Sequence, residues 1–177
     1  SAASDVYKRQ EMYSLTGQST IAKTSAEVIE VHLDPPDPPA SPSVLEAIET
    51  SDVLVLGPGS WFTSVMPHLL VPQIVEAIMD SDALKILTLN VAGADETNGF
   101  SPARHLEVLA EHEPRIRFDV VLADRSFARS DPHLGTFARN LGARIVEADL
   151  AMHDGSARHD PLRLASAYAE VMGVRIR

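Results

Sequence analysis

Short runs of consecutive apolar residues recur along this chain, and each is separated from the next by a stretch with helical spacing of apolar positions. The runs begin near residues 53, 85, 118 and 143. Continuous apolar runs of this kind are typical of strands that are buried on both faces of a parallel sheet. Strands that alternate with helices form βαβ units with right-handed crossovers. The pattern therefore predicts an α/β fold with a mostly parallel sheet covered by helices.

The helices between these strands are bounded by capping signals. Ser41 before Pro42, and Asp160 before Pro161, each place an N-cap residue ahead of a proline in the first helical position. Gly142 ends another helix at a position that favours a left-handed backbone. The predicted helices cover residues 42–49, 72–79 and 133–141, and two more begin at residues 102 and 161.

The spacing of apolar residues also predicts the buried face of two helices. The helix that opens with Ser101 and Pro102 is expected to turn inward Ala103, Leu106, Leu109 and Ala110. The helix that opens at Pro161 is expected to turn inward Leu162, Ala165, Ala169 and Met172.

The amino-terminal part has a different pattern. The first ten residues show neither helical nor strand periodicity, and we expect residues 1–15 to be a non-native or disordered leader. Ser19–Ala22 and Val28–Leu33 are strand-like runs that favour a β-hairpin or an edge pair. The segment DPPDPP at residues 34–39 is a stiff connector, because its prolines fix φ and remove donors. We expect residues 16–177 to belong to one domain.

The turn Gly57-Pro58-Gly59-Ser60 follows the first apolar run and is the sharpest local feature of the sequence. Ligands of such sheets bind at the carboxyl ends of the strands, where this turn must lie. Its glycines let the backbone approach a ligand, and the following helix start offers free N–H groups. Ser60, Thr63 and Ser64 add hydroxyl donors. The turn fits a phosphate; the alternative is an ordinary strand-to-helix turn capped by Ser64.

A second polar loop follows the strand near residue 85. It contains Asn90 and the segment Glu96-Thr97-Asn98-Gly99. These groups could recognise a ribose, a sugar or a metal-bound phosphate. The alternative is a solvated turn without a ligand, which is common for loops of this composition.

Other side chains form no recognisable catalytic or metal signature. No pair of histidines has the i, i+4 spacing of a zinc-binding helix, and Ser60 does not lie within GxSxG. We therefore assign no metal site and no catalytic residue. Trp61 and Phe62 could stack on a base or sugar ring, but packing in the core or in an interface explains them equally well.

The amino-acid composition limits the kinds of partner that this chain can bind. The chain has 25 acidic and 15 basic residues and a net charge of −10, so a broad positive surface for nucleic acid or anionic membrane is absent. Any phosphate must be held locally. The chain has no cysteine, which excludes disulfides and thiolate catalysis and is compatible with a reducing compartment. Since no apolar run is long enough for a membrane helix, we expect a cytoplasmic protein.

Four blocks in this order resemble the YvcK family, also called gluconeogenesis factors, within the larger group that includes the phospholactate transferase CofD. The resemblance extends from about Thr16 to Met172. The blocks are VLGPGSWFTSVMPHLLVPQIVEAI, LNVAGADETNGFSPARHLEVL, FDVVLAD and HDPLRLASAYAEVM.

The resemblance implies a Rossmann-like three-layer fold that binds a UDP-sugar such as UDP-N-acetylglucosamine, in proteins linked to carbon metabolism, cell-wall synthesis and cell shape. The family's GPGS turn matches residues 57–60, with Thr63 and Ser64 in the matching hydroxyl places. Its ETDG-type loop matches residues 96–99, where Asn98 replaces the usual acidic residue and removes a charge. Family members also open with a glycine-rich strand-loop-helix that this sequence lacks before Thr16, so we expect a carboxy-terminal portion with an incomplete site.

Three functional hypotheses follow. The first is a non-enzymatic regulatory protein that binds a UDP-sugar and needs no cofactor. The second is a phospholactate transferase-like enzyme, in which Mg²⁺ would assist a nucleoside-diphosphate-linked substrate. The third is an interaction module that forms a homodimer through Trp61, Phe62 and the helix faces.

Overall fold

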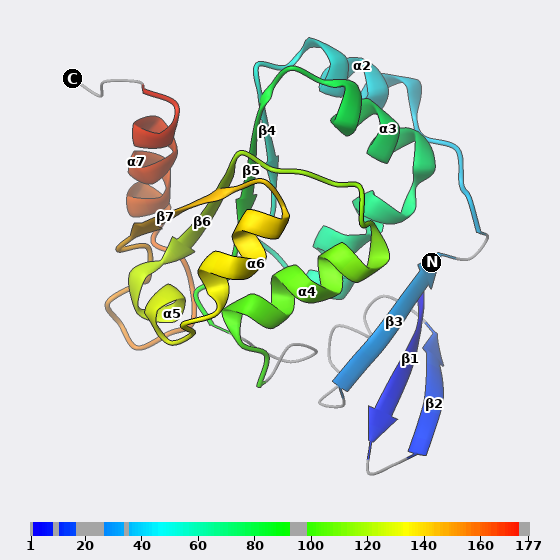
Figure 1. The fold of residues 1–177 in the computed structure, drawn as a ribbon, viewed down its shortest axis with the longest axis horizontal. Coiled ribbons are helices and arrows are strands. Elements are labelled where there is room, and N and C mark those ends of the chain that lie inside the picture. Colours follow the sequence, from blue (N-terminus) through cyan, green and yellow to red (C-terminus); the bar gives the residue numbers. More distant parts are fainter. Residues whose placement is uncertain (1, 9–10, 17–26, 34–35, 93–98, 174–177) are drawn as a thin grey trace.

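A four-stranded parallel sheet forms the centre of the described chain (Figure 1). The computed structural model describes residues 2–8, 11–16, 27–33, 36–92 and 99–173. The strand order β4-β5-β6-β7 follows the sequence and confirms the predicted α/β fold. The strands are β4 (Val53–Leu56), β5 (Leu84–Thr88), β6 (Val120–Asp124) and β7 (Arg144–Ala148).

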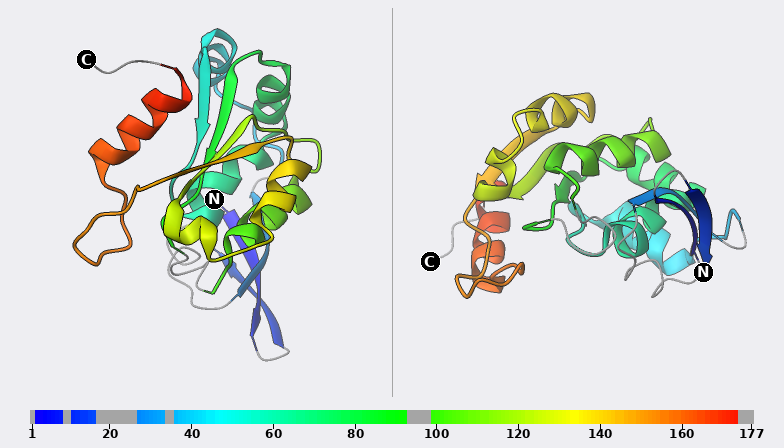
Figure 2. Two further views of the ribbon diagram at one scale, coloured as in Figure 1. Left: turned by 60° about the vertical axis from the view of Figure 1, so that its left-hand side comes forward. Right: turned by 90° about the horizontal axis from the view of Figure 1, so that it is seen from below.

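Helices cover both faces of this sheet (Figure 2). The helix α7 packs on one face, and α4, α6 and the segment from η1 to α3 pack on the other. The described helices are α2 (Pro42–Thr50), the π-helix η1 (Trp61–Val65), the 3-10 helix η2 (Met66–Leu70), α3 (Pro72–Asp80), α4 (Pro102–His112), α5 (Arg125–Arg129), α6 (Leu134–Asn140) and α7 (Pro161–Val171).

The central strands supply side chains alternately to two apolar cores. In β5, Ile86 belongs to the core under α7, whereas Leu87 belongs to the larger core on the other face. In β6, Leu122 belongs to the core under α7 and Val121 to the larger core. This alternation follows from the twofold repeat of a strand, and it explains why apolar residues occupy consecutive positions at Ile86 and Leu87 and from Val120 to Ala123.

Strand β4 differs from the prediction that it is buried on both faces. It lies at one edge of the described sheet, and 46% of Val55 is exposed. Its composition therefore resembles that of a central strand although its position is at the edge.

The buried face of α7 also differs from the prediction. Leu162 is 83% exposed, Met172 is 42% exposed and Ala165 is exposed, so Ala169 alone of the four predicted residues is buried. Helix α7 carries a second stripe at equivalent spacing, and this second stripe faces the sheet. The hydroxyl of its Tyr168 lies 2.6 Å from Thr88 Oγ1 on β5. The stripe that faces the sheet contains Leu164, Ala167, Tyr168 and Val171.

The face predicted for α4 is confirmed. Its Ala103, Leu106 and Leu109 are buried, and Ala110 packs partly buried against the same core. Two caps form through their side chains: the Ser101 side chain accepts a hydrogen bond from the backbone N–H of Arg104, and Asp160 caps α7 through the N–H groups of Leu162 and Arg163. Ser41 occupies the predicted N-cap position of α2, but its side chain makes no capping hydrogen bond.

A small antiparallel sheet precedes the parallel sheet in the chain, with strand order β2-β1-β3. Its strands are β1 (Ala2–Lys8), β2 (Glu11–Thr16) and β3 (Glu27–Leu33). Strand β3 confirms the predicted run at 28–33, but its described partner is β1, and Ser19–Ala22 lies outside the described residues. Strand β1 places regular structure in the first ten residues, where the sequence shows no periodicity, and β2 follows it. A non-native origin of residues 1–15 stays a prediction, as does their separation from the domain at 16–177.

Among the described residues, no single helix is long and apolar enough to cross a membrane. The segments Trp61–Leu70 and Pro72–Asp80 meet that standard of length and composition only when taken together, and they are bent by 76°.

Candidate functional site

The turn at the carboxyl end of β4 requires glycine at both of its ends. Gly57 has a φ of 76°, and a Cβ atom there would lie 2.5 Å from the backbone oxygen of Thr88. Gly59 has a φ of 156°, and a Cβ atom there would lie 3.3 Å from Ser64 Cβ. Both conformations are accessible mainly to glycine. Glycine is therefore required at both positions by the shape of the turn.

Asn90, at the carboxyl end of the neighbouring strand β5, contacts this turn directly. The Gly59 N–H donates to Asn90 Oδ1 over 3.0 Å, and Asn90 Nδ2 donates to the Gly59 carbonyl over 2.8 Å. The sequence predicted that both residues contribute to a ligand site. The structure brings them together, but the amide of Gly59 is already hydrogen-bonded within the protein.

The segment after the turn is irregular. It is the five-residue π-helix η1, followed by the 3-10 helix η2, where the sequence favours an ordinary helix start. Ser60 is the N-cap, and its carbonyl accepts hydrogen bonds from the N–H groups of Ser64 and Val65. A helix this short contributes little dipole, so the predicted helix N-terminus is a weaker anion site than the sequence suggested.

Burial limits which groups of this segment can reach a ligand. Trp61 and Phe62 are fully buried, and Thr63 is 5% exposed. Ser60 is partly exposed and Ser64 is exposed. Among the described residues, no hydrogen bond is recorded for the N–H or the hydroxyl of Ser60. The reachable donors of the turn are therefore the N–H and hydroxyl of Ser60 and the hydroxyl of Ser64.

Trp61 and Phe62 anchor this segment in the core. Trp61 Nε1 donates to the backbone oxygen of His105 over 3.2 Å, and the Trp61 and His105 rings meet edge to face at 5.1 Å. Phe62 meets Phe100 edge to face at 6.0 Å. Because both side chains are inaccessible, they neither stack on a ligand nor form the dimer contact that the third hypothesis assigns to them.

The loops after β6 and β7 are joined by a carboxylate that sequence reasoning missed. Asp124 is 5% exposed, and its Oδ1 accepts the N–H groups of Leu150 and Ala151 over 2.9 and 3.2 Å. Its Oδ2 accepts the N–H of Ser126 over 3.1 Å. An acidic residue at the last position of an apolar strand was the available signal. The groups that hold these loops together are thus internal to the protein.

His159 lies beside this carboxylate. Burial lowers the pKa of its imidazole, and the negative charge of Asp124 and a hydrogen bond with the Leu89 backbone oppose that shift. Its Nε2 atom is buried, and it has no hydrogen-bond partner among the described residues. His159, in the loop after β7, therefore lies near the carboxyl ends of β5 and β6.

The remaining titratable groups of the last loop form ion pairs near the surface. His153 Nε2 lies 3.2 Å from Asp149, whose carboxylate also pairs with Arg163. The His153 contact comes first in holding the pKa of Asp149 below its ordinary value, with Arg163 adding to it. Within the described part of the chain, no three or more His, Cys, Asp or Glu side chains are arranged to hold a metal ion.

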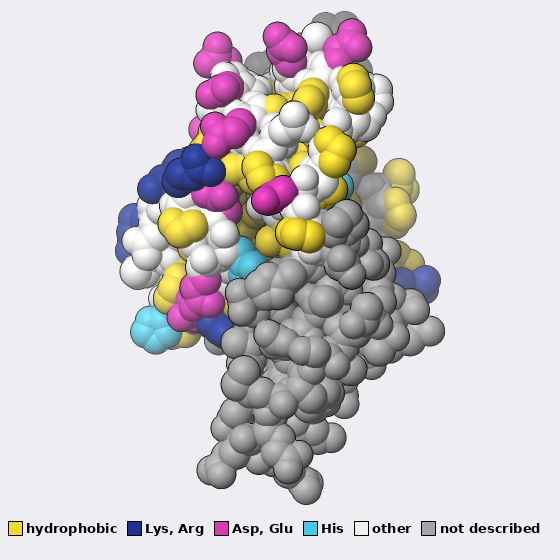
Figure 3. All heavy atoms as spheres, turned by 90° about the vertical axis from the view of Figure 1, so that its right-hand side faces the viewer, with side chains coloured by type: hydrophobic (Ala, Val, Ile, Leu, Met, Phe, Trp, Pro, Cys, Tyr) yellow, Lys and Arg dark blue, Asp and Glu magenta, His cyan; other side chains and the backbone are white. Residues whose placement is uncertain are grey.

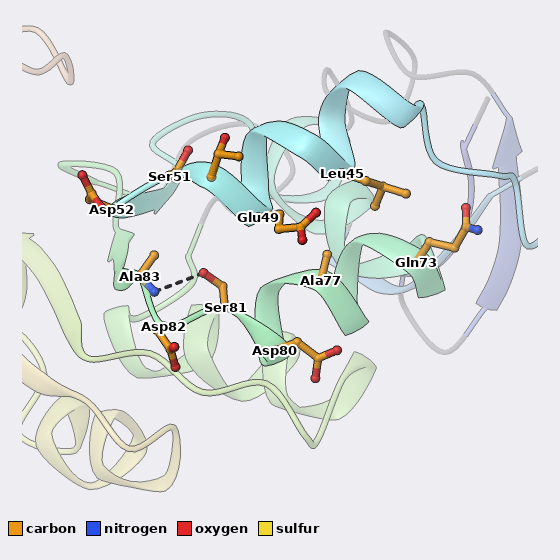
Figure 4. A pocket seen from close by; sticks show the side chains of 11 residues that line it. Leu45, Glu49, Ser51, Asp52, Gln73, Ala77, Asp80, Ser81, Asp82 and Ala83 are labelled. Atoms are coloured by element: carbon orange, nitrogen blue, oxygen red, sulfur yellow. Dashed lines mark hydrogen bonds between the residues drawn. The ribbon is translucent and has the colours of Figure 1, made fainter.

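Two hollows are lined in part by residues of α2 and α3. A groove of about 310 Å³ runs along β4 up to the turn, and apolar side chains such as Leu54 and Ile78 line it, with His68 and Ser64 at its polar end. A larger pocket of about 610 Å³ lies at the amino ends of β4 and β5 (Figure 4). Acidic side chains gather at that end of the molecule (Figure 3). Those lining the larger pocket are Glu49, Asp52, Asp80 and Asp82.

The second predicted loop is described only at its ends. Asn90 and Gly99 lie within the described residues, and Gly99 has a φ of 83° with no atom within 4 Å of a Cβ built there. Glu96, Thr97 and Asn98 lie outside the described residues, so their assignment to a ligand site stays a prediction.

This chain is similar to one protein family model and to several proteins that share a name. The family model described as "2-phospho-L-lactate transferase CofD" matches residues 5–160. A "Putative gluconeogenesis factor" from Mycobacterium leprae is 42% identical over 166 residues, which are 92% of this chain and 45% of that protein. One from Mycobacterium tuberculosis is 43% identical over 156 residues, or 86% of this chain and 45% of that protein. The chain thus spans about half the length of the curated relatives it matches.

A solved structure shares the fold. The crystal structure of a member of the UPF0052 family from Bacillus halodurans matches with a TM-score of 0.75 and 28% sequence identity. The match covers 94% of this chain and 57% of that one.

Proposed function

Because this chain belongs to the CofD family, as the match over residues 5–160 shows, we propose that it is part of a UDP-sugar-binding regulatory protein. The ligand is of the UDP-N-acetylglucosamine type. Relatives at 42% and 43% identity carry the name putative gluconeogenesis factor, which supports a role in carbon metabolism. Effects on cell-wall synthesis and cell shape, and a cytoplasmic location, belong to the same proposal.

One observation carries the proposal. A glycine-bounded turn stands at the carboxyl end of a parallel strand, where such sheets bind their ligands. At that place no hydrogen bond is recorded among the described residues for the N–H or the hydroxyl of Ser60, and the residue as a whole is partly exposed. Two neutral donors on one residue suit a phosphate oxygen of a nucleoside diphosphate. The adjoining groove offers apolar surface for an uncharged part of the ligand.

The direct test is calorimetric titration of UDP-N-acetylglucosamine into the full-length protein that contains this chain. Binding supports the proposal, and the absence of binding at millimolar ligand contradicts it. Ser60→Ala should weaken binding by about 1 kcal/mol, which is about fivefold, because it removes one hydroxyl donor to phosphate. Ser166→Ala, at an exposed position on α7, is the matched control and should leave affinity unchanged.

The description of the matched family favours a second function, transfer of a phospholactyl-type group from a nucleoside-diphosphate-linked substrate. Mg²⁺ would assist that reaction. Incubating the full-length protein with a deazaflavin acceptor, Mg²⁺ and the activated donor separates the two proposals. Turnover would establish the transferase and overturn the purely regulatory role.

A further inference from the structure

Asn90 satisfies both hydrogen-bonding groups of the Gly59 main chain. Its Oδ1 accepts the Gly59 N–H over 3.0 Å, and its Nδ2 donates to the Gly59 carbonyl over 2.8 Å. The two residues are 31 positions apart in the sequence. A side-chain amide provides one acceptor and one donor at adjacent atoms, whereas a carboxylate has no donor and a hydroxyl offers both functions at a single atom. The chemistry of this contact therefore favours a side-chain amide, which Asn90 provides.

The end of β5 also limits the other glycine of the turn. A Cβ atom at Gly57 would lie 2.5 Å from the backbone oxygen of Thr88, two residues before Asn90. Both glycines of the turn are thus in contact with residues 88–90. Because glycine has wide conformational freedom, a turn bounded by two glycines needs such contacts to hold one shape.

The two hydrogen bonds between Asn90 and Gly59, called the clamp below, also decide which donors remain for a ligand. With the Gly59 amide occupied by Asn90, and Trp61 and Phe62 fully buried, the N–H and hydroxyl of Ser60 are the next groups along the chain. Their direction depends on the peptide that links Gly59 to Ser60, whose carbonyl is the one that Asn90 Nδ2 holds.

From these contacts we propose that Asn90 is a positioning residue for the ligand turn. It fixes the peptide between Gly59 and Ser60, so that the Ser60 donors face the ligand in one orientation, and it does not itself contact the ligand. The inference rests on the proposed function, and it changes the role that the sequence suggested for Asn90 from ligand contact to support. It also makes the loops after β4 and β5 a single unit.

The test compares Asn90→Asp with Asn90→Ala in the full-length protein, using UDP-N-acetylglucosamine as the probe. Asp keeps the size of the side chain and the acceptor for the Gly59 N–H, but it places a negative oxygen opposite the Gly59 carbonyl. We expect affinity to fall at least about tenfold in both variants, because the Ser60 donors lose their fixed direction. Asn140→Asp, at an exposed position ending α6, makes the same chemical change and should leave affinity unchanged.

A second measurement separates positioning from general loss of structure. Hydrogen exchange of the Gly59 amide, followed by NMR, should be slow in the wild type and markedly faster in Asn90→Ala, while exchange in the core strand β6 stays unchanged. Wild-type affinity in Asn90→Asp, or an unprotected Gly59 amide in the wild type, overturns the inference. If the wild type binds no UDP-sugar, the proposed function fails, and Gly59 exchange alone then decides whether the clamp exists.

Discussion

The two ends of the parallel sheet differ in how their polar groups are used. At the carboxyl end, side chains from one loop hold the main chain of another: Asn90 holds Gly59, and Asp124 holds Leu150 and Ala151. At the amino end, the Asp119 carboxylate likewise accepts the Lys85 N–H over 2.8 Å, but the four exposed carboxylates that line the larger pocket have no hydrogen bond recorded among the described residues. Figure 4 shows these carboxylates and the bond from Ala83 N to Ser81 Oγ.

This difference explains why the larger hollow is not the candidate site. Its volume of about 610 Å³ exceeds the groove beside the turn, but its carboxylates repel one another and any anion. Specific sites depend on a few well-placed polar groups more than on volume. The carboxyl end has such groups in fixed positions, so the changes below should affect stability strongly there and weakly at the carboxylates that line the larger pocket.

The largest effect is expected for Gly57→Ala. The new Cβ would lie 2.5 Å from the Thr88 oxygen, at a φ of 76° that an L-residue rarely adopts. We expect a loss of about 3 kcal/mol or more in the free energy of unfolding, measured by urea denaturation. The matched control is Gly155→Ala, where φ is 81° but no atom lies within 4 Å of the Cβ position. It should cost about 1 kcal/mol, from backbone strain alone. Equal losses would show that the clash is relieved.

Features that depend on residues close together in the sequence could be predicted. The strands were predicted to within a few residues, because each contains a short run of consecutive apolar residues. The glycine-bounded turn and the caps at Ser101 and Asp160 were also predictable, since each depends on residues close in sequence.

The contacts between loops could not be predicted in this way. The clamp joins Asn90 to Gly59 across 31 positions, and Asp124 reaches Leu150 across 26. Neither has a local pattern, because the sheet brings the partners together. The buried face of α7 was assigned wrongly for a related reason: two apolar stripes fit the helical period, and packing against β5 selects the one that includes Tyr168.

The next effect in size is expected for Asp124→Asn. The carboxylate accepts three backbone N–H groups, and an amide would present an NH₂ group to at least one of those donors. Because the site is 5% exposed, we expect a loss of about 1–3 kcal/mol in the free energy of unfolding. Hydrogen exchange should become faster at Leu150 and Ala151. An unchanged unfolding midpoint would contradict the role of Asp124 in joining the loops.

A smaller loss in the free energy of unfolding is expected as pH falls. Burial among Trp61, Phe100 and Phe127 lowers the pKa of the His105 imidazole, against a weaker opposing bond to the Ser101 carbonyl. The unfolded chain then binds a proton near pH 6.5 that the folded chain does not. Stability should therefore be fully present above that pH and decrease below it until the folded pKa is reached, by up to about 1.4 kcal/mol per pH unit.

His105→Leu should make that decrease less steep in urea denaturations between pH 7 and about 5. The hydrogen bond from Trp61 goes to the backbone oxygen of His105, so it can persist in the variant. Part of the slope should remain, because the pKa of His159 is also lowered by burial. Combining His105→Leu with His159→Gln should remove more of it. A single variant with the wild-type slope would show that the His105 imidazole does not titrate with unfolding.

The smallest effect is expected for Asp82→Asn at the amino end. This is the same chemical change as Asp124→Asn, but Asp82 is exposed and no hydrogen bond of its carboxylate is recorded among the described residues. Removing one of several neighbouring negative charges should change the free energy of unfolding by no more than about 0.5 kcal/mol, with stabilisation favoured at low salt. Urea denaturation at two salt concentrations measures both quantities. A loss as large as that of Asp124→Asn would mean that the carboxylates of the larger pocket hold structure together, and the contrast between the two ends of the sheet would then fail.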